Sequence, residues 1–323
     1  MPNSEIRVAV VMPVFNDWDS FGVVLKHLGE HEFGSRYRIC VVAVDDGSSD
    51  VARASSFADR LGKVEELKVI RLASNLGHQR AIAVGMVSAF QKSEFDAVVI
   101  MDCDGEDRPS DVAKLLANWD RHPTLITVAR RARRSESFLF RCFYAFYKVL
   151  FWAMTGEAIN FGNFCVIPQN ALQSLVHNPA IWNNLAATIK RSRLACAYIP
   201  IDRGKRISGE SRLNFVDFAL HGISAISVYS DVVVIRIVAM AIVTGLLTMV
   251  GVAIVVYIRL ATELAIPGWA SYMTGALTII FSQTLLMAGL ALLQLVSLRS
   301  LNQFVPTVDA RKFVAEETSE KSK

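Results

Sequence analysis

In the first 130 residues, continuous apolar runs alternate with segments in which apolar residues have helical spacing. Continuous apolar runs, each followed by a polar turn, lie at Arg7–Val14, Arg38–Val44, Leu67–Leu72, Asp96–Met101 and Leu125–Ala129. The segments between them have the spacing of helices, at Asp19–Gly29, Asp50–Leu61, Gln79–Gln91 and Asp111–Trp119. Strands that alternate with helices and are apolar throughout predict an α/β domain, with a parallel sheet covered on both faces.

Two much longer apolar runs follow near the C-terminus. Ile237–Ile258 is uncharged over 22 residues, and Leu264–Leu298 carries no charge. About 20 apolar residues cross the hydrocarbon core of a bilayer as a helix. A pair of buried core helices is the alternative, but such helices rarely run so long without a charge. We therefore expect a transmembrane hairpin, with its second helix beginning near Trp269 because Pro267 and Gly268 precede it.

The domain organisation follows from these runs. We expect a catalytic α/β domain at 1–212, a helix at 213–231, a hairpin at 232–298 and a tail at 299–323. The helix at 213–231 has rough amphipathic spacing and leads into a membrane span, which favours a place in the membrane interface over a core-facing one. The polar end of the tail predicts a solvated, disordered segment. Lys and Arg lie before the first span and after the second, so both ends should face the cytoplasm at the inner membrane.

Polar motifs fall at the predicted carboxyl ends of four strands. These are Phe15-Asn16-Asp17, Asp45-Asp46-Gly47-Ser48, Asn75-Leu76-Gly77 and Asp102-Cys103-Asp104. Ligands of open α/β sheets bind at this edge. Acidic or polar turns after four successive strands are hard to explain as solvated loops, so we expect a functional site here.

The acids of this edge suggest two kinds of contact. Asp102 and Asp104 flank a single residue, so both carboxylates can reach one hard cation, and Mg²⁺ or Mn²⁺ would also neutralise a diphosphate. Asp45 and Asp46 can accept hydrogen bonds from a nucleobase or ribose. The alternative is a capping role at the following helix, with Ser48 or Asp50 as the cap.

Composition and missing motifs narrow the function classes. The chain of 323 residues is 52% apolar with a net charge of only +4, which does not suggest binding to nucleic acid. It has neither a P-loop motif nor a GxGxxG after the first strand. Basic runs at Arg130–Arg134 and Arg203–Arg206 suit phosphate groups, although such runs are as often solvated or lipid-facing.

Six motifs together resemble a known family. They are VVMPVFND, VDDGSSD, NLGHQRAIAVGM, MDCDGED, INFGNFCVIP and RISGESR, followed by two C-terminal spans. The chain resembles the family-2 glycosyltransferases with a GT-A fold. More narrowly, it resembles the polyprenyl-phosphate glycosyltransferases, the group that includes dolichol-phosphate mannose synthase and its bacterial undecaprenyl-phosphate relatives.

The resemblance implies an inverting transfer from a nucleotide-sugar donor, UDP- or GDP-linked, to a polyprenyl phosphate in the bilayer, with Mg²⁺ or Mn²⁺. By position, Asp102 and Asp104 would hold the metal. The resemblance places the donor among Pro13, Phe15, Asp17, Asp45, Asp46, Asn75, Ser211 and Arg212. It implies a catalytic role for Asp102, Asp104, Asp107, Arg130 and Arg206, in which the two arginines bind phosphate groups.

The sequence also departs from the family pattern. Gly105-Glu106 replaces the usual residue-plus-Gln, Asp17 stands where Glu is common, and Arg212 stands where Lys is common. A family relative with a protein or glycan acceptor, and a non-catalytic accessory protein that binds a nucleotide sugar or a lipid phosphate, are the alternatives. Both acids of Asp-x-Asp are present, which favours an enzyme. The sequence leaves homo-oligomer formation open.

Overall fold

The structure is a computed structural model that describes residues 5–131, 138–202, 204–207, 215–263, 266–300 and 304–322. It divides into two compact units. The first unit comprises 1–146, 158–228 and 304–323, and the second comprises 147–157 and 229–303.

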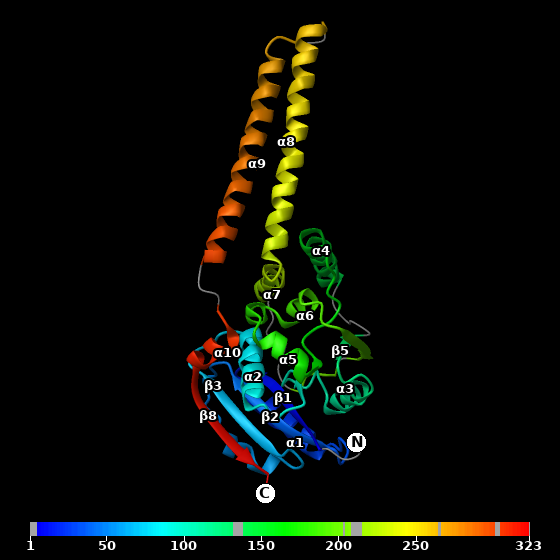
Figure 1. The fold of residues 1–323 in the computed structure, drawn as a ribbon, viewed down its shortest axis with the longest axis vertical. Helices are drawn as coiled ribbons and strands as arrows, with labels where there is room; N and C mark the ends of the chain where they lie inside the picture. Colours follow the sequence, from blue (N-terminus) through cyan, green and yellow to red (C-terminus); the bar gives the residue numbers. More distant parts are fainter. Residues whose placement is uncertain are drawn as a thin grey trace. The chain divides into compact units, whose positions relative to one another are not determined.

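An eight-stranded sheet forms the centre of the first unit (Figure 1). Its strand order is β7-β5-β6-β4-β1-β2-β3-β8. The strands are β1 Ile6–Val14, β2 Tyr37–Asp45, β3 Glu66–Leu72, β4 Ala97–Ile100, β5 Ile126–Arg131, β6 Cys165–Pro168, β7 Cys196–Ile201 and β8 Val314–Lys321. The neighbours β3, β2, β1 and β4 are parallel, as the apolar runs predict. Their carboxyl ends therefore meet at one edge.

Helices cover both faces of the sheet. One face packs against α1 (Trp18–Glu30), α3 (Pro109–Arg121) and the 3₁₀ helix η1 (Ala54–Arg60). The other packs against α2 (His78–Lys92), α5 (Gln169–Val176), η2 (Pro179–Trp182) and α6 (Leu185–Arg191). Alternate residues of each strand point to opposite faces, so Val10 and Val11 enter different cores. Burial on both faces explains why these strands are apolar throughout.

The sheet contains antiparallel strands that the sequence reading did not predict. β6 runs antiparallel to both β4 and β5, and β8 runs antiparallel to β3. The prediction of a disordered tail is therefore wrong, because α10 (Pro306–Asp309), the 3₁₀ helix η3 (Ala310–Phe313) and β8 fold onto the first unit. The edge of β3 presents main-chain groups that need partners, and β8 supplies them.

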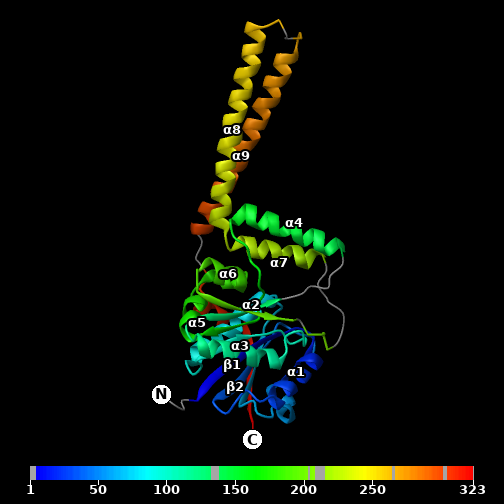
Figure 2. The same ribbon diagram turned by 90° about the vertical axis from the view of Figure 1, so that its right-hand side faces the viewer.

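Two other expectations about helices need adjustment. The helix predicted over Asp50–Leu61 is shortened to η1, of which only Ala54 and Phe57 are buried. The helix predicted at 213–231 is observed as α7 (Phe215–Ser227), which contacts α6 (Figure 2). The sequence reading missed α4 (Phe138–Thr155), whose Phe146, Val149 and Trp152 are exposed.

The second unit contains a helical hairpin (Figure 1). Its helices are α8 (Ser230–Ala261) and α9 (Trp269–Ser300), the latter beginning at the residue predicted. Both are long and apolar enough to cross a membrane. They pack closely, with Gly245 against Phe281 and Gly251 against Leu277. Arg236 of α8 donates to the main-chain oxygens of Trp152 and Ala153 near the end of α4.

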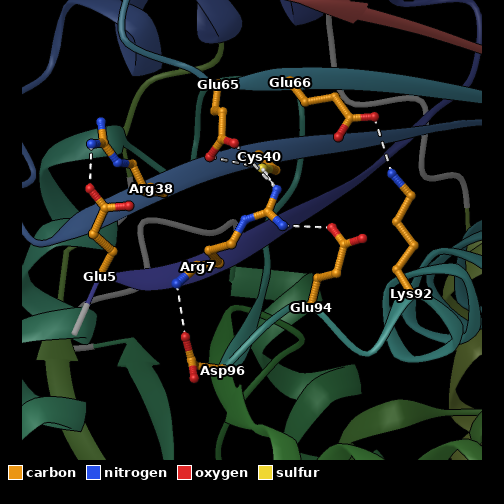
Figure 3. A network of polar contacts seen from close by, with 9 residues as sticks. All are labelled: Glu5, Arg7, Arg38, Cys40, Glu65, Glu66, Lys92, Glu94 and Asp96. Carbon is orange, nitrogen blue, oxygen red and sulfur yellow. Dashed lines mark hydrogen bonds and ion pairs between the residues drawn. The ribbon is translucent and has the colours of Figure 1, made fainter.

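The amino ends of the parallel strands carry a network of charged residues (Figure 3). Arg7 contacts Glu94 at 2.6 Å and Glu65 at 3.4 Å, and its main-chain N–H donates to Asp96. Arg38 pairs with Glu5, and Lys92 pairs with Glu66 at 3.1 Å. Cys40 lies in the middle, where burial, and secondarily Glu65, raise the pKa of its thiol to about 11. At this edge each of these acids has a donor nearby.

Candidate active site

Hydrogen bonds join the turns after β1 and β2 at the carboxyl edge. The main-chain N–H of Asn16 donates to Ser48 Oγ at 2.8 Å, and the N–H of Ser49 donates to Asn16 Oδ1 at 2.8 Å. Asn16 has a φ of 50°, a left-handed conformation that Asn tolerates better than most residues. The two turns therefore form one rigid surface, with Pro13 buried in β1 and Phe15 exposed beside it.

Asp45 and Asp46 are both buried but have different contacts. Asp46 accepts from the N–H groups of Leu76 and Gly77, at 2.7 and 2.9 Å, and so fixes the turn after β3. Burial raises the pKa of Asp46, while these two donors oppose the rise. Asp45 is fully buried, and its Oδ1 accepts from the N–H of Ser48. Its Oδ2 has no hydrogen bond, and Arg71 Nε lies 3.9 Å away. Asp45 thus retains an acceptor for a ligand.

The turn after β3 lies against the turn after β2. Gly47 has a φ of +75°, and a Cβ at this position would lie 2.7 Å from the main-chain nitrogen of Asn75. A side chain here would force the two turns apart, so glycine is required by both the close approach and the conformation. Asn75 itself is exposed at this edge.

The acidic loop after β4 is held by two of its own acids. Asp107 is buried and its Oδ2 accepts from the N–H of Asp102 at 3.0 Å. Asp104 Oδ1 accepts from the N–H of Glu106 at 3.0 Å, around Gly105 with a φ of +88°. These contacts show Asp107 in a shaping role within the loop. They leave Asp102 Oδ1 facing the imidazole of His78 and Asp104 Oδ2 facing the guanidinium of Arg206.

Arg206 and His78 approach the acids from outside the loop. Arg206 reaches both Asp17 Oδ2, at 3.5 Å, and Asp104 Oδ2, at 3.7 Å. His78 Nε2 lies 3.4 Å from Asp102 Oδ1 and 3.3 Å from the Nδ2 of Asn163. The structure therefore brings together Asp17, Asp102, Asp104 and Arg206 of the predicted set.

Three other predicted residues are not brought to the acids by the described part of the structure. Arg130 is exposed near the end of β5, which β6 separates from β4. Ser211 and Arg212 lie outside the described residues.

Sequence reasoning also missed some residues of the site. His78 is not among the site residues expected from the sequence, but it begins α2 and faces Asp102. Asn163 was missed, although the motif INFGNF contains it. His221 of α7 lies within electrostatic range of His78 and Asp102, which no spacing in the sequence indicates.

The acids fit a divalent cation that shares its ligands with a substrate. Within the described residues, no group of three or more His, Cys, Asp or Glu could hold a metal alone. However, Asp102 Oδ1 is a buried carboxylate oxygen without a hydrogen bond. Mg²⁺ typically uses one or two carboxylates and completes its shell with water and substrate phosphates. Asp102 and Asp104 match this donor set.

Comparison with known families decides the assignment. The model of glycosyl transferase family 2 matches residues 9–174, which hold most of β1, all of β2 to β4 and every acid of the candidate site. The chain belongs to glycosyl transferase family 2. The predicted family-2 assignment and GT-A sheet are confirmed.

Several curated relatives and one solved structure are similar to this glycosyltransferase. An uncharacterized glycosyltransferase of Bacillus subtilis, YkcC, is 24% identical over 82% of this chain and 81% of its own. A prophage bactoprenol glucosyl transferase homolog of Escherichia coli is 22% identical, covering 69% and 73%. A dodecaprenyl-phosphate galacturonate synthase of Rhizobium johnstonii is 24% identical, covering 43% and 40%. Mannosyl-3-phosphoglycerate synthase from Rubrobacter xylanophilus shares the fold, with a TM-score of 0.50, 16% identity and coverage of 69% and 72%.

Proposed function

We propose that this glycosyltransferase moves a sugar from a nucleotide-diphosphate donor to a polyprenyl phosphate. The observation that carries the proposal is a pair of buried carboxylate oxygens without hydrogen bonds, Asp45 Oδ2 and Asp102 Oδ1, at the carboxyl ends of the two strands that flank β1. A buried acceptor without a partner costs about 1–3 kcal/mol, so such atoms are expected where a ligand completes them. The names of the bactoprenol and dodecaprenyl-phosphate relatives suggest the acceptor.

The nucleoside would lie over the joined turns of β1, β2 and β3. Asp45 Oδ2 can accept from a ring N–H of uracil or guanine, which supports a UDP- or GDP-sugar as the donor. Pro13 and Phe15 would line the base, and Asp17 and Asn75 would contact the ribose. Asp46 would act through the turn that it fixes rather than by contact, since both its oxygens already accept N–H groups.

Mg²⁺ or Mn²⁺ would be held by Asp102 and Asp104. When bound, the ion would offset the charge that develops on the departing nucleoside diphosphate. Asp107 maintains the loop that presents both carboxylates. Arg206 already lies beside Asp104, within reach of a phosphate bound there.

The acceptor would attack through a phosphate oxygen. A phosphate monoester is an anionic nucleophile, so a strong general base is not required. Its oxygen forms a bond to the anomeric carbon while the bond from that carbon to the diphosphate breaks, which inverts the configuration. Arg130, Ser211 and Arg212 are the remaining candidates to bind the acceptor phosphate, because guanidinium groups match phosphate oxygens and a serine hydroxyl can donate to them.

The membrane is the source of this acceptor. α8 and α9 can anchor the chain in the bilayer, and the exposed Leu220 and Ile223 of α7 suit an interfacial position. The Lys and Arg bias supports a catalytic domain on the cytoplasmic side of the inner membrane.

The experiment uses the full chain in detergent with undecaprenyl phosphate and a panel of labelled UDP- and GDP-sugars. We expect label in the organic phase from one donor with Mn²⁺ or Mg²⁺, and none with EDTA. Nucleotide binding without transfer from any donor would contradict the proposal and would favour a different acceptor or a non-catalytic role.

A further inference from the structure

A short segment, 204–207, lies directly on the acidic loop. The N–H of Gly204 donates to the main-chain oxygen of Glu106 at 2.8 Å, and that of Ile207 donates to the main-chain oxygen of Asp104 at 2.9 Å. The side chain of Ile207 covers Gly105 so closely that a Cβ at Gly105 would lie 2.5 Å from its Cγ1. The backbone on both sides of Arg206 is therefore fixed against the loop.

This fixed backbone places the Arg206 guanidinium between two strand ends. It lies 3.5 Å from Asp17 Oδ2, beyond β1, and 3.7 Å from Asp104 Oδ2, beyond β4. The side chains of Arg206, Asp17 and Asp104 are only 25%, 17% and 14% exposed. At such low exposure the attraction exceeds that of a surface pair, and the two carboxylates need a counter-ion.

The geometry of these contacts would allow Arg206 to exchange a carboxylate partner for another anion. Strong guanidinium–carboxylate pairs have N···O distances of about 2.7–2.9 Å and are often bidentate. The contacts of Arg206 with Asp17 and Asp104 are longer, at 3.5 and 3.7 Å. A divalent cation on Asp104 would repel the guanidinium, because both are positive and would lie within a few ångström of each other.

We propose that Arg206 is an internal counter-ion of the donor site. It neutralises Asp17 and Asp104 while no donor is bound, and it gives up Asp104 when the metal and the donor diphosphate arrive. Its guanidinium then turns to the phosphate oxygens, which replace the lost carboxylate. The identity of the arriving donor rests on the proposed function, whereas the competition between Arg206 and a cation rests only on the observed contacts.

This role predicts effects of opposite sign. Removing the charge of Arg206 should tighten the binding of a metal alone, because the competing cation is gone. The same change should slow transfer, because the diphosphate loses a partner. An arginine that only binds phosphate would leave the affinity for the metal unchanged.

The test measures Mn²⁺ binding to the full chain in detergent, without nucleotide or lipid, by the electron paramagnetic resonance signal of free Mn²⁺. We expect Arg206→Gln and Arg206→Met to bind Mn²⁺ about three- to tenfold more tightly than the unaltered chain, which corresponds to the weakening of one partly buried ion pair. Arg206→Lys, which keeps the charge, should change the affinity less. The matched control is Lys205→Gln, which removes the same charge from an exposed neighbour and should change the affinity less than about twofold.

Two results would overturn the proposal. One is an unchanged or weaker Mn²⁺ affinity in both neutral variants that still unfold cooperatively on heating. The other is an equal tightening in Lys205→Gln, which would mean a general effect of net charge. Because no donor or lipid is present, tighter Mn²⁺ binding by Arg206→Gln together with a failure of sugar transfer would sustain this inference and refute only the proposed function.

Discussion

The two edges of the central sheet carry similar numbers of acids but use them differently. At the amino edge, Arg7 contacts Glu65, Glu94 and Asp96 (Figure 3). Among the described residues of this edge, the buried side-chain atom without a hydrogen bond is a donor, Arg7 Nε. At the carboxyl edge the unsatisfied buried atoms include the acceptors Asp45 Oδ2 and Asp102 Oδ1. At the amino edge, the acids have donors within the protein, while at the carboxyl edge some carboxylate oxygens remain available to accept from a ligand.

The difference shows how to separate structural from functional charge in one fold. Acids that already accept hydrogen bonds with both oxygens, such as Asp46, stabilise the chain. Acids that hold one oxygen back, such as Asp45, reduce stability and are retained where the ligand compensates. Substitutions of acids with a free oxygen at the carboxyl edge should therefore mainly lower activity. Substitutions of paired charges at the amino edge should mainly lower stability.

The largest effect is expected for Asp104→Asn at the carboxyl edge. It should lower the rate of sugar transfer by about a hundredfold or more, since one of the two carboxylates that would hold the metal is removed. The thermal unfolding temperature should stay within a few degrees, because Asp104 has like-charged neighbours in its loop. Transfer assays and calorimetry would measure both.

The control for that variant is Asp19→Asn, an exposed acid at the start of α1. Transfer should be unchanged there. Equal losses of activity in the two variants would contradict the division between the edges.

Deletion of residues 314–323 should have the next largest effect, this time on stability. It removes β8, which pairs with β3 over most of that strand, and breaks the contact of Lys68 with Glu317 at 2.8 Å. We expect a loss of about 2–3 kcal/mol and a tendency to aggregate through the opened edge of β3. Denaturant unfolding of the full chain and light scattering would measure these changes.

A deletion of only residues 322–323 is the matched control for this variant. It keeps β8 and should lose much less stability. If both deletions unfolded alike, the strand pairing would not be the stabilising contact.

Arg7→Leu should destabilise the amino edge by about 1–2 kcal/mol. It leaves Glu65 and Glu94 without their shared cation, and partial exposure of these groups limits the cost. At a temperature where the variant is folded, transfer should proceed at the normal rate. Arg38→Leu, which breaks the more exposed pair with Glu5, should cost less. A large loss of activity with unchanged stability in Arg7→Leu would contradict the comparison.

The smallest effect is expected for Ser48→Ala in the joined turns. Ser48 is buried and its Oγ accepts from the N–H of Asn16, so the variant should lose about 1 kcal/mol of stability. The loosened turns should also raise the KM for the donor more than they lower kcat. The neighbouring Ser49→Ala is the control, because Ser49 contributes its main-chain N–H and its side chain is exposed. Equal effects at the two serines would argue against a stabilising role for the hydrogen bond between Asn16 and Ser48.

Much of the fold could be predicted because its strands are apolar in a way that only two-sided burial explains. The runs at β1, β2 and β4 and the start of α9 at Trp269 were read correctly. β8 could not be predicted, since VAEETSEK is polar and forms a strand only because β3 offers a free edge. β6 has four residues, too few for a periodic signal.

The location of the candidate site could be predicted from the sequence, but the hydrogen-bond and ion-pair partners of its side chains could not. The Asp-x-Asp pair and the four polar turns predicted a site at the carboxyl edge of the sheet, where the structure places these residues. The separate roles of Asp45 and Asp46 depend on which main-chain groups face each carboxylate, and adjacent residues in a sequence give no such information. The contact of Arg206 with Asp17 joins residues 189 positions apart, which requires the folded chain.

The most direct test of the account compares two acceptors in one assay. The full chain would be incubated with its donor and Mn²⁺, and with either undecaprenyl phosphate or undecaprenol, which differs only by lacking the phosphate. The account predicts labelled lipid from the phosphate alone, with none in the presence of EDTA. Equal label in both lipids, or release of free sugar without labelled lipid, would contradict it.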